Sequence, residues 1–80
     1  MPTVLGSFGP YRLFFVSFDC AEPAHIHAQR DRDTCKCWLG PVQLASNHGF
    51  SAVELNTIRR IVESRQVVLM EAWNEHCGGG

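Results

Sequence analysis

The 80-residue chain carries little net charge and lacks long apolar runs. Seven Lys and Arg stand against eight Asp and Glu, which gives a formal charge of −1. This balance argues against a broad basic face for nucleic acid, although a small basic cluster could still hold a few phosphates. No apolar run approaches the ~20 residues that a membrane span needs, and no positive region precedes the apolar N-terminal segment as it would in a signal peptide. We therefore expect a cytoplasmic protein that does not interact with membranes.

Several well-known catalytic motifs are also missing. The sequence contains no P-loop, no GxSxG or HExxH motif and no dinucleotide-binding glycine pattern. These absences leave open whether the protein is an enzyme. The length predicts one domain over residues 1–77, followed by a flexible glycine tail at 78–80. A domain this short buries only about 60% of its unfolded surface, so a partner or a metal could contribute much of its stability.

The cysteines allow two opposite interpretations. In a secreted chain, four cysteines would permit two disulfides, whereas in the cytosol they would be thiols or metal ligands. Because we expect a cytosolic chain, we expect thiols or ligands at all four positions, which are Cys20, Cys35, Cys37 and Cys77.

The first half of the chain predicts strands. Residues 3–5 favour extended structure, and 11–18 is the strongest strand signal because it is rich in aromatic and β-branched residues. Both faces of 11–18 are largely apolar, which indicates a central strand. Residues 25–30 and 34–39 follow as two further strands, joined by an Asp-Arg-Asp hairpin loop. Pro41 cannot donate to a ladder, so we expect an edge or a bulge there, with a short apolar continuation after it.

The second half predicts two helices. Ser51 reads as the N-cap of the first helix and Glu54 as its capping-box partner. One unbroken helix over 52–77 would be about 39 Å long, which exceeds the diameter of so small a domain, so we expect a break near 64–66. Apolar residues recur at helical spacing in each helix: Leu55, Ile58, Ile61 and Val62 in the first, and Val68, Leu69, Ala72 and Trp73 in the second. Both tryptophans of the chain are interpreted as core residues. The predicted fold class is α+β, with a small antiparallel sheet of three to four strands followed by two C-terminal helices packed on one face.

Two pairs of chemically active residues lie close together in the chain, His25-x-His27 and Cys35-x-Cys37. On a strand, residues two apart point to the same face. If the hairpin centres on Arg32, His27 lies opposite Cys37 and all four side chains share one face, where they could form a tetrahedral zinc site. A one-residue change in register would place the pairs on opposite faces. Cysteine is also among the most buried residue types, so Cys35 and Cys37 are more often core residues than ligands.

A hydrolytic function would place histidine at its centre. His25 and His27 could act as general acid and base near neutral pH. Arg30 or Lys36 could hold phosphate charge, with Glu22 as a further supporting residue. Such a group can cleave RNA without a metal, because the 2′-hydroxyl supplies the nucleophile.

Several segments of the chain resemble one family of small bacterial proteins. They appear in the order MPTVL, YRLFF, EPAHIH, WLGPVQLASNHGF, ELNTIRRIV and EAWNE. Together they resemble domain-of-unknown-function family 4160 (DUF4160). Members look like one half of two-gene modules that resemble toxin–antitoxin pairs, which implies a protein partner and a toxin-like activity. The family's Glu-Pro-x-His-x-His pattern maps to residues 22–27 here. The family usually has apolar residues where this chain has Cys35 and Cys37, which favours a core role for them.

Three functions follow as alternatives. The favoured one is the toxin-like, RNA-directed member of a two-gene module, with the His25-x-His27 strand as its site. The second is a non-catalytic regulatory or protein-interaction module, which the small size and near-zero net charge favour. The third is a metal-binding module with a zinc site of His25, His27, Cys35 and Cys37. We thus expect a small protein partner, with RNA as a further candidate and zinc as a cofactor only in the third alternative. The oligomeric state stays open.

Overall fold

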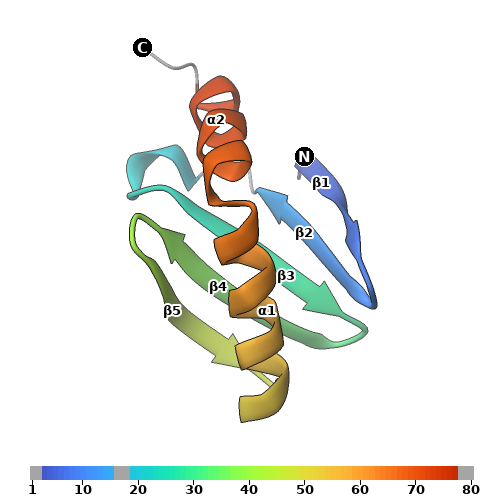
Figure 1. Ribbon diagram of the computed structural model, residues 1–80. Coiled ribbons are helices and arrows are strands. Elements are labelled where there is room, and N and C mark those ends of the chain that lie inside the picture. The colour runs from blue at the N-terminus through green and yellow to red at the C-terminus, as the bar shows by residue number, and fades with distance from the viewer. Residues whose placement is uncertain (1–2, 16–18, 78–80) are drawn as a thin grey trace.

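The computed structural model describes residues 3–15 and 19–77 and shows an α+β fold (Figure 1). One antiparallel sheet is followed by two helices. The elements are, in chain order, β1 (Thr3–Phe8), β2 (Tyr11–Phe15), the 3₁₀ helix η1 (Asp19–Ala21), β3 (His25–Arg30), β4 (Asp33–Leu39), β5 (Val42–His48), α1 (Ala52–Ser64) and α2 (Gln66–His76). The predicted fold class is confirmed. The predicted number of three to four strands is too low, because the short continuation expected after Pro41 is a full strand and gives the sheet five strands.

The sheet is a meander in which each strand lies beside its neighbours in the chain, in the order β1-β2-β3-β4-β5. Tight turns make this arrangement possible. Gly9 (φ 63°) in the β1–β2 turn and Asp31 (φ 55°) in the β3–β4 turn adopt the left-handed conformation, which glycine and aspartate tolerate. β5 is an edge strand, and its pairing with β4 shifts register between Lys36 and Cys37. The edge expected around Pro41 is therefore confirmed.

β2 carries alternate buried and accessible side chains. Tyr11, Leu13 and Phe15 are buried, whereas Arg12 is exposed and Phe14 is half-buried. The strand lies between β1 and β3, so the prediction that it is a central strand is confirmed. The predicted strand continued for three more residues, which lie outside the described ranges.

The helix boundaries follow the sequence signals. Ser51 is the N-cap of α1, and its Oγ accepts a hydrogen bond from the backbone N–H of Glu54 at 3.2 Å. This is the capping-box arrangement that the sequence predicts. Arg65 lies between α1 and α2, so the predicted interruption is confirmed.

Each helix buries one side. The buried residues are Ile58 and Val62 on α1, and Leu69 and Trp73 on α2. Val68, one of the apolar residues at helical spacing in the second helix, does not join the core, because its side chain is 64% exposed. Successive residues of a helix differ by about 100° around its axis, so Val68 points away from the core when Leu69 points into it.

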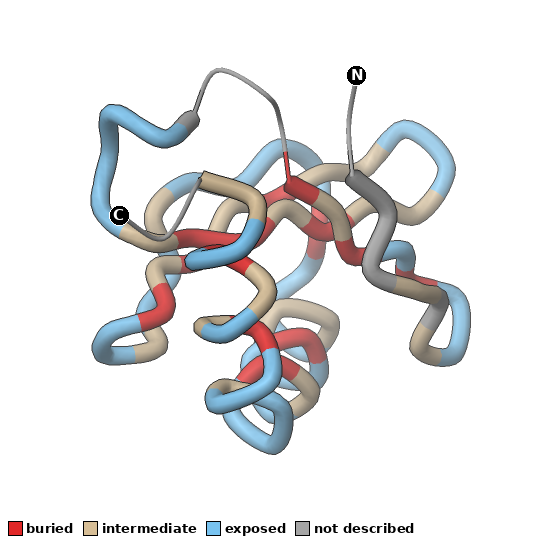
Figure 2. Tube along the Cα trace, turned by 90° about the horizontal axis from the view of Figure 1, so that it is seen from above, coloured by how far each residue is buried: buried red, intermediate tan, exposed pale blue. Residues whose placement is uncertain are grey.

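The core lies between the helices and one face of the sheet. Viewed from above, the helices occupy one side of the sheet, and the buried residues gather where the two layers meet (Figure 2). α1 packs mainly against β5, and α2 against β4. Gln66 Nε2 donates a hydrogen bond to the Leu39 carbonyl at 2.6 Å, which joins the start of α2 to the end of β4. The prediction of two helices on one face is confirmed.

Within residues 3–15 and 19–77, no helix is long and apolar enough to cross a membrane. The predicted glycine tail at 78–80 lies outside the described ranges. The domain boundary at residue 77 stays a prediction.

Candidate functional site

The β3–β4 register decides which side chains can act together. A two-residue turn joins the strands, so Arg30 pairs with Asp33 and His27 pairs with Lys36. Cys37 lies opposite Ile26 and not opposite His27. Of the two registers that the sequence leaves open, the structure therefore has the one that is not centred on Arg32.

This register separates the two histidines from the two cysteines. Cys35 and Cys37 pair with Ala28 and Ile26, and they lie in the core with 2% and 4% of their surface exposed. Successive residues of a strand point to opposite faces, so the histidines on either side of Ile26 point away from the cysteines. The predicted zinc site of His25, His27, Cys35 and Cys37 is wrong for this reason. The interpretation of the two cysteines as core residues is confirmed.

Cys35 and Cys37 are reduced thiols inside the core. A hydrogen bond to Cys37, together with burial, raises the pKa of Cys35 far above its ordinary value. Nucleophilic attack by cysteine requires the thiolate, so a thiol held in the protonated form is inert. Cys35 is therefore a packing residue.

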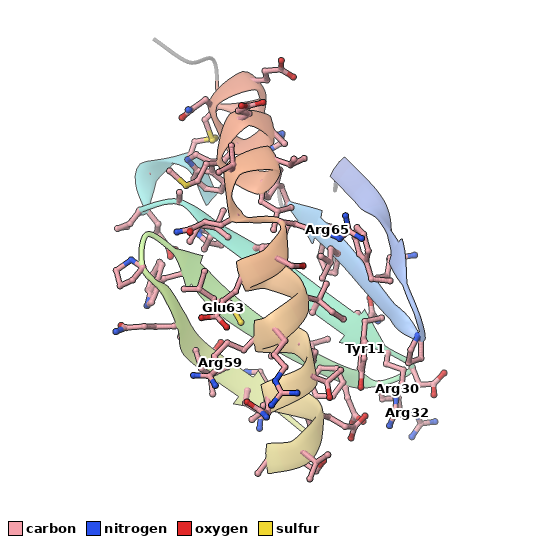
Figure 3. The ribbon with its side chains drawn as sticks, viewed as in Figure 1. Tyr11, Arg30, Arg32, Arg59, Glu63 and Arg65 are labelled. Atoms are coloured by element: carbon pink, nitrogen blue, oxygen red, sulfur yellow. A yellow bond between two sulfur atoms is a disulfide. The ribbon has the colours of Figure 1, made fainter. Side chains whose placement is uncertain are left out.

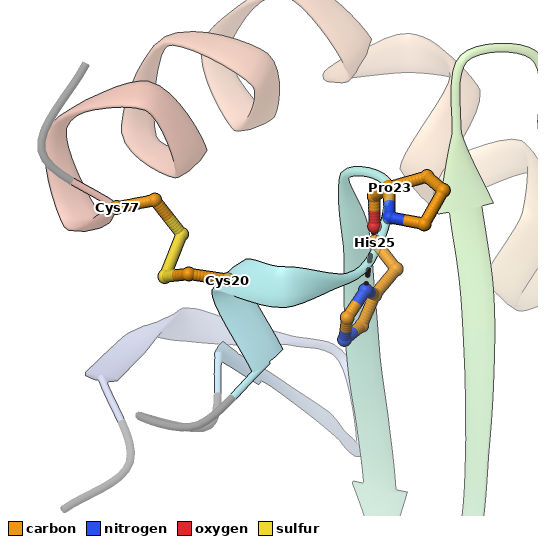
Figure 4. Close-up of a disulfide and its surroundings, with 4 residues drawn as sticks. All are labelled: Cys20, Pro23, His25 and Cys77. Atoms are coloured by element: carbon orange, nitrogen blue, oxygen red, sulfur yellow. Dashed lines mark hydrogen bonds between the residues drawn. A yellow bond between two sulfur atoms is a disulfide. The ribbon is translucent and has the colours of Figure 1, made fainter. Parts of the chain in front are cut away.

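The other two cysteines are bonded to each other. Cys20 on η1 and Cys77 after α2 form a disulfide, with their Cα atoms 5.5 Å apart (Figure 4). In this structure the two residues form a disulfide and are not the thiols or metal ligands that the sequence led us to expect, because the fold brings together two residues that are 57 apart in the sequence. The bond fastens the segment that leads into β3 to the end of the last helix.

His25 is fully buried at the start of β3, with 0% of its surface exposed. Its Nδ1 donates a hydrogen bond to the Pro23 carbonyl at 2.8 Å, which orients the ring (Figure 4). Its ring centroid lies 5.7 Å from that of Trp38 and 4.9 Å from that of Trp73. A side chain without accessible surface cannot contact a bound substrate directly. The placement of His25 therefore indicates a packing role at the end of the sheet.

His27 lies in a row of rings and basic groups that crosses three strands. Its imidazole stacks on Phe14 of β2, with centroids 5.4 Å apart and planes 18° apart. The Arg12 guanidinium lies 5.6 Å from the centroid of the Phe14 ring, and the Lys36 ammonium lies 4.7 Å from the centroid of the Trp38 ring. We call these five residues the platform. They alternate with buried residues along their strands, so the platform lies on the sheet face opposite the helices of Figure 1.

The three predicted supporting residues lie in different places. Lys36 belongs to the platform, and its Nζ forms an ion pair with Glu22. Arg30 lies at the β3–β4 turn, as Figure 3 shows, and its Nη1 is 2.8 Å from Glu54 Oε2 in the first turn of α1. Arg30 therefore joins β3 to α1 and does not accompany the histidines.

Sequence reasoning missed three members of the platform, Arg12, Phe14 and Trp38. The interpretation of Trp38 as a core residue is wrong, because it is half-buried and lines a pocket of about 420 Å³ at the β4–β5 turn. Part of the signal is present in the sequence, because residues two apart on a strand share a face and Arg12 and Phe14 are two apart. Only the pairing of β2 with β3, and of β3 with β4, shows that residues from all three strands meet there.

Comparisons with known proteins identify a family. The chain matches the family model described as Domain of unknown function (DUF4160) over residues 11–74, which is well over half of its length. The matched range begins at the first residue of β2 and ends within α2, so it includes the platform. A search of curated proteins and a search of solved structures each returned no match. The chain belongs to the DUF4160 family of domains of unknown function.

Proposed function

We propose that the platform binds single-stranded RNA. The observation that supports this proposal is the row of aromatic rings, imidazole and cations on the sheet face away from the helices. Proteins that recognise single-stranded nucleic acid stack the bases on aromatic side chains and hold the backbone with basic ones. In this chain Phe14 and Trp38 supply the rings, and Arg12 and Lys36 supply the charge.

The charge of the chain predicts that stacking contributes more than phosphate contacts. Arg12 and Lys36 are the two cations of the platform, and single strands lose affinity with salt at a slope of about −0.7 per neutralised phosphate. We therefore expect a shallow slope of about −1.4 in log K against log salt. Each stacked base contributes roughly 1–3 kcal/mol, which corresponds to a change of about 5- to 150-fold in affinity.

Glu22 makes this proposal more specific. Its carboxylate is paired with Lys36, so a phosphate that approaches the ammonium must compete with it. Removing that carboxylate charge frees Lys36 for the RNA backbone. We therefore expect Glu22→Gln to bind RNA more tightly, whereas Lys36→Gln binds it more weakly.

Cleavage of the bound RNA is a further step of the same proposal. His27 is half-buried beside Phe14, where its imidazole could take the proton from a 2′-hydroxyl. The resulting oxygen would attack the adjacent phosphorus, and the 5′-oxygen of the next nucleotide would leave with a proton from solvent. A toxin-like role in a two-gene module would rest on this contact with RNA. Expression of the chain alone would then slow growth, and His27→Ala would remove the effect.

The test is fluorescence anisotropy with end-labelled single-stranded RNA at several salt concentrations. Phe14→Ala and Trp38→Ala are each expected to weaken binding by about 5- to 150-fold. Arg59→Gln is the matched control, because Arg59 is an exposed cation of α1 on the opposite face (Figure 3). Unchanged affinity in both ring variants, or an equal loss in Arg59→Gln, would refute binding by the platform.

A protein partner is the second candidate, and the β5 edge favours it. An edge strand offers backbone groups to which another strand can pair. A groove of about 250 Å³ lies beside that edge, between Leu44 of β5 and Leu55 of α1, and Leu44 is 48% exposed. We expect Leu44→Asp to abolish capture of a partner while leaving RNA binding unchanged. If the wild-type chain and Leu44→Asp capture the same amount of partner in a pull-down, partner binding at the β5 edge is refuted.

A further inference from the structure

The end of α2 brings together three side chains that can bind a metal. They are Cys20 of η1, His76 in the last turn of α2 and Cys77 directly after it. Their sulfur and nitrogen atoms all lie within 4.8 Å of one another. Cys20 and Cys77 are joined as a disulfide in this structure, so the cluster holds its donor atoms together in the oxidised state.

We propose that reduction of the Cys20–Cys77 disulfide converts this cluster into a site for a thiophilic divalent cation, with zinc as the preferred ion. Two thiolates and one imidazole are a donor set that zinc favours. In a tetrahedral site with Zn–S distances of about 2.3 Å, the two sulfur atoms would lie roughly 3.8 Å apart. The cluster already holds its donors within 4.8 Å, so separation of the two sulfurs by side-chain rotation is enough to admit the ion.

The chemistry balances with a dithiol as the reductant. Its two thiols become a disulfide, and the two electrons and two protons pass to the sulfurs of Cys20 and Cys77. The zinc ion then replaces both thiol protons, which are released to solvent, and its own oxidation state does not change.

The surroundings of the cluster favour this exchange. Cys20 is exposed, so a reductant can reach its sulfur. His76 and Cys77 lie at the C-terminus of α2, where the helix dipole places partial negative charge and stabilises a cation. Three protein ligands leave one position of the tetrahedron for water or an incoming ligand.

The first experiment is a titration of the full chain with Co²⁺, which reports tetrahedral thiolate coordination by its absorption spectrum, followed by displacement with Zn²⁺. The reduced protein is expected to bind one ion with a sulfur-to-metal charge-transfer band, and the oxidised protein is expected to bind none. Cys20→Ser and His76→Ala should each lower the affinity at least tenfold. The reduced wild-type chain is the matched reference for Cys20→Ser, because both lack the disulfide.

Three control variants make the result specific. Cys35→Ala with Cys37→Ala removes the two core thiols and should leave binding unchanged, as should His48→Ala, which removes an exposed imidazole elsewhere. Cys20→His exchanges one ligand for another and should retain a bound ion with a weaker charge-transfer band, which tests the site even if Cys20→Ser folds poorly. Binding by the oxidised chain, unchanged affinity in Cys20→Ser, loss of binding in the core-thiol variant, or no binding on reduction would each overturn the proposal.

Discussion

Reduction of the disulfide between Cys20 and Cys77 is expected to lower the free energy of unfolding substantially. The bond closes a loop between residues 57 apart in the sequence. The chain-entropy relation gives roughly 4 kcal/mol at 25 °C for a loop of this length, and loss of native disulfides in small domains typically costs about 2–5 kcal/mol. The free energy of unfolding of the whole domain is expected to be only about 4–12 kcal/mol. The disulfide therefore accounts for a large share of the stability of the oxidised chain.

The assay is urea unfolding followed by circular dichroism, with and without a thiol reductant. With a slope of about 1 kcal/mol per molar urea for so small a protein, the midpoint should fall by roughly 2–5 M on reduction. A double variant, Cys20→Ser with Cys77→Ser, should unfold at the lower midpoint under both conditions. The urea midpoint of Cys35→Ala should still fall when the reductant is added, because Cys35 does not take part in the disulfide. The reasoning would be refuted if the urea midpoint of the wild-type protein were the same with and without reductant. The same would follow if the denatured, non-reduced chain contained four titratable thiols.

Three further predictions concern single positions. Gly49→Ala should destabilise the protein by roughly 1–3 kcal/mol in urea unfolding, because Gly49 has φ +104° and an added Cβ would collide with Asp33; a stability equal to that of wild type would contradict this. Ser51→Ala should cost about 1 kcal/mol in the same assay by removing the cap of α1, and Ser51→Asp should restore most of it. Cys35 should resist alkylation by iodoacetamide at neutral pH until the chain unfolds, as its raised pKa and burial require; rapid modification of Cys35 in the native state, read by mass spectrometry, would show that the thiol is accessible.

Local signals in the sequence predicted the elements well, because each of those signals acts within a few residues. The capping box of Ser51 and Glu54 sets the start of α1, and the length limit on a small domain predicted the break at Arg65. These features depend on hydrogen bonds and turns that the neighbouring residues supply. The strands at 25–30 and 34–39 were predicted for the same reason.

The candidate site depended on register, which the sequence leaves open by one residue. Hairpin loops of two and three residues are both compatible with the Asp-Arg-Asp segment, and the choice decides whether His27 faces Cys37 or Lys36. Contacts between residues far apart in the chain could not be predicted from the sequence either. Nothing near Cys20 indicates that α2 ends beside it, and nothing near Arg30 indicates that Glu54 will receive its guanidinium.

The meander has a consequence for the growing chain on the ribosome. Strand order in space equals the order of synthesis, so each new strand can pair with the one that has just emerged, without waiting for a distant segment. The helices that cover the apolar face are made last. A nascent chain halted after β5 would therefore display Leu13, Phe15 and Ile26 to its surroundings, and it would depend on a chaperone, or on prompt completion of α1 and α2, to avoid association with other chains.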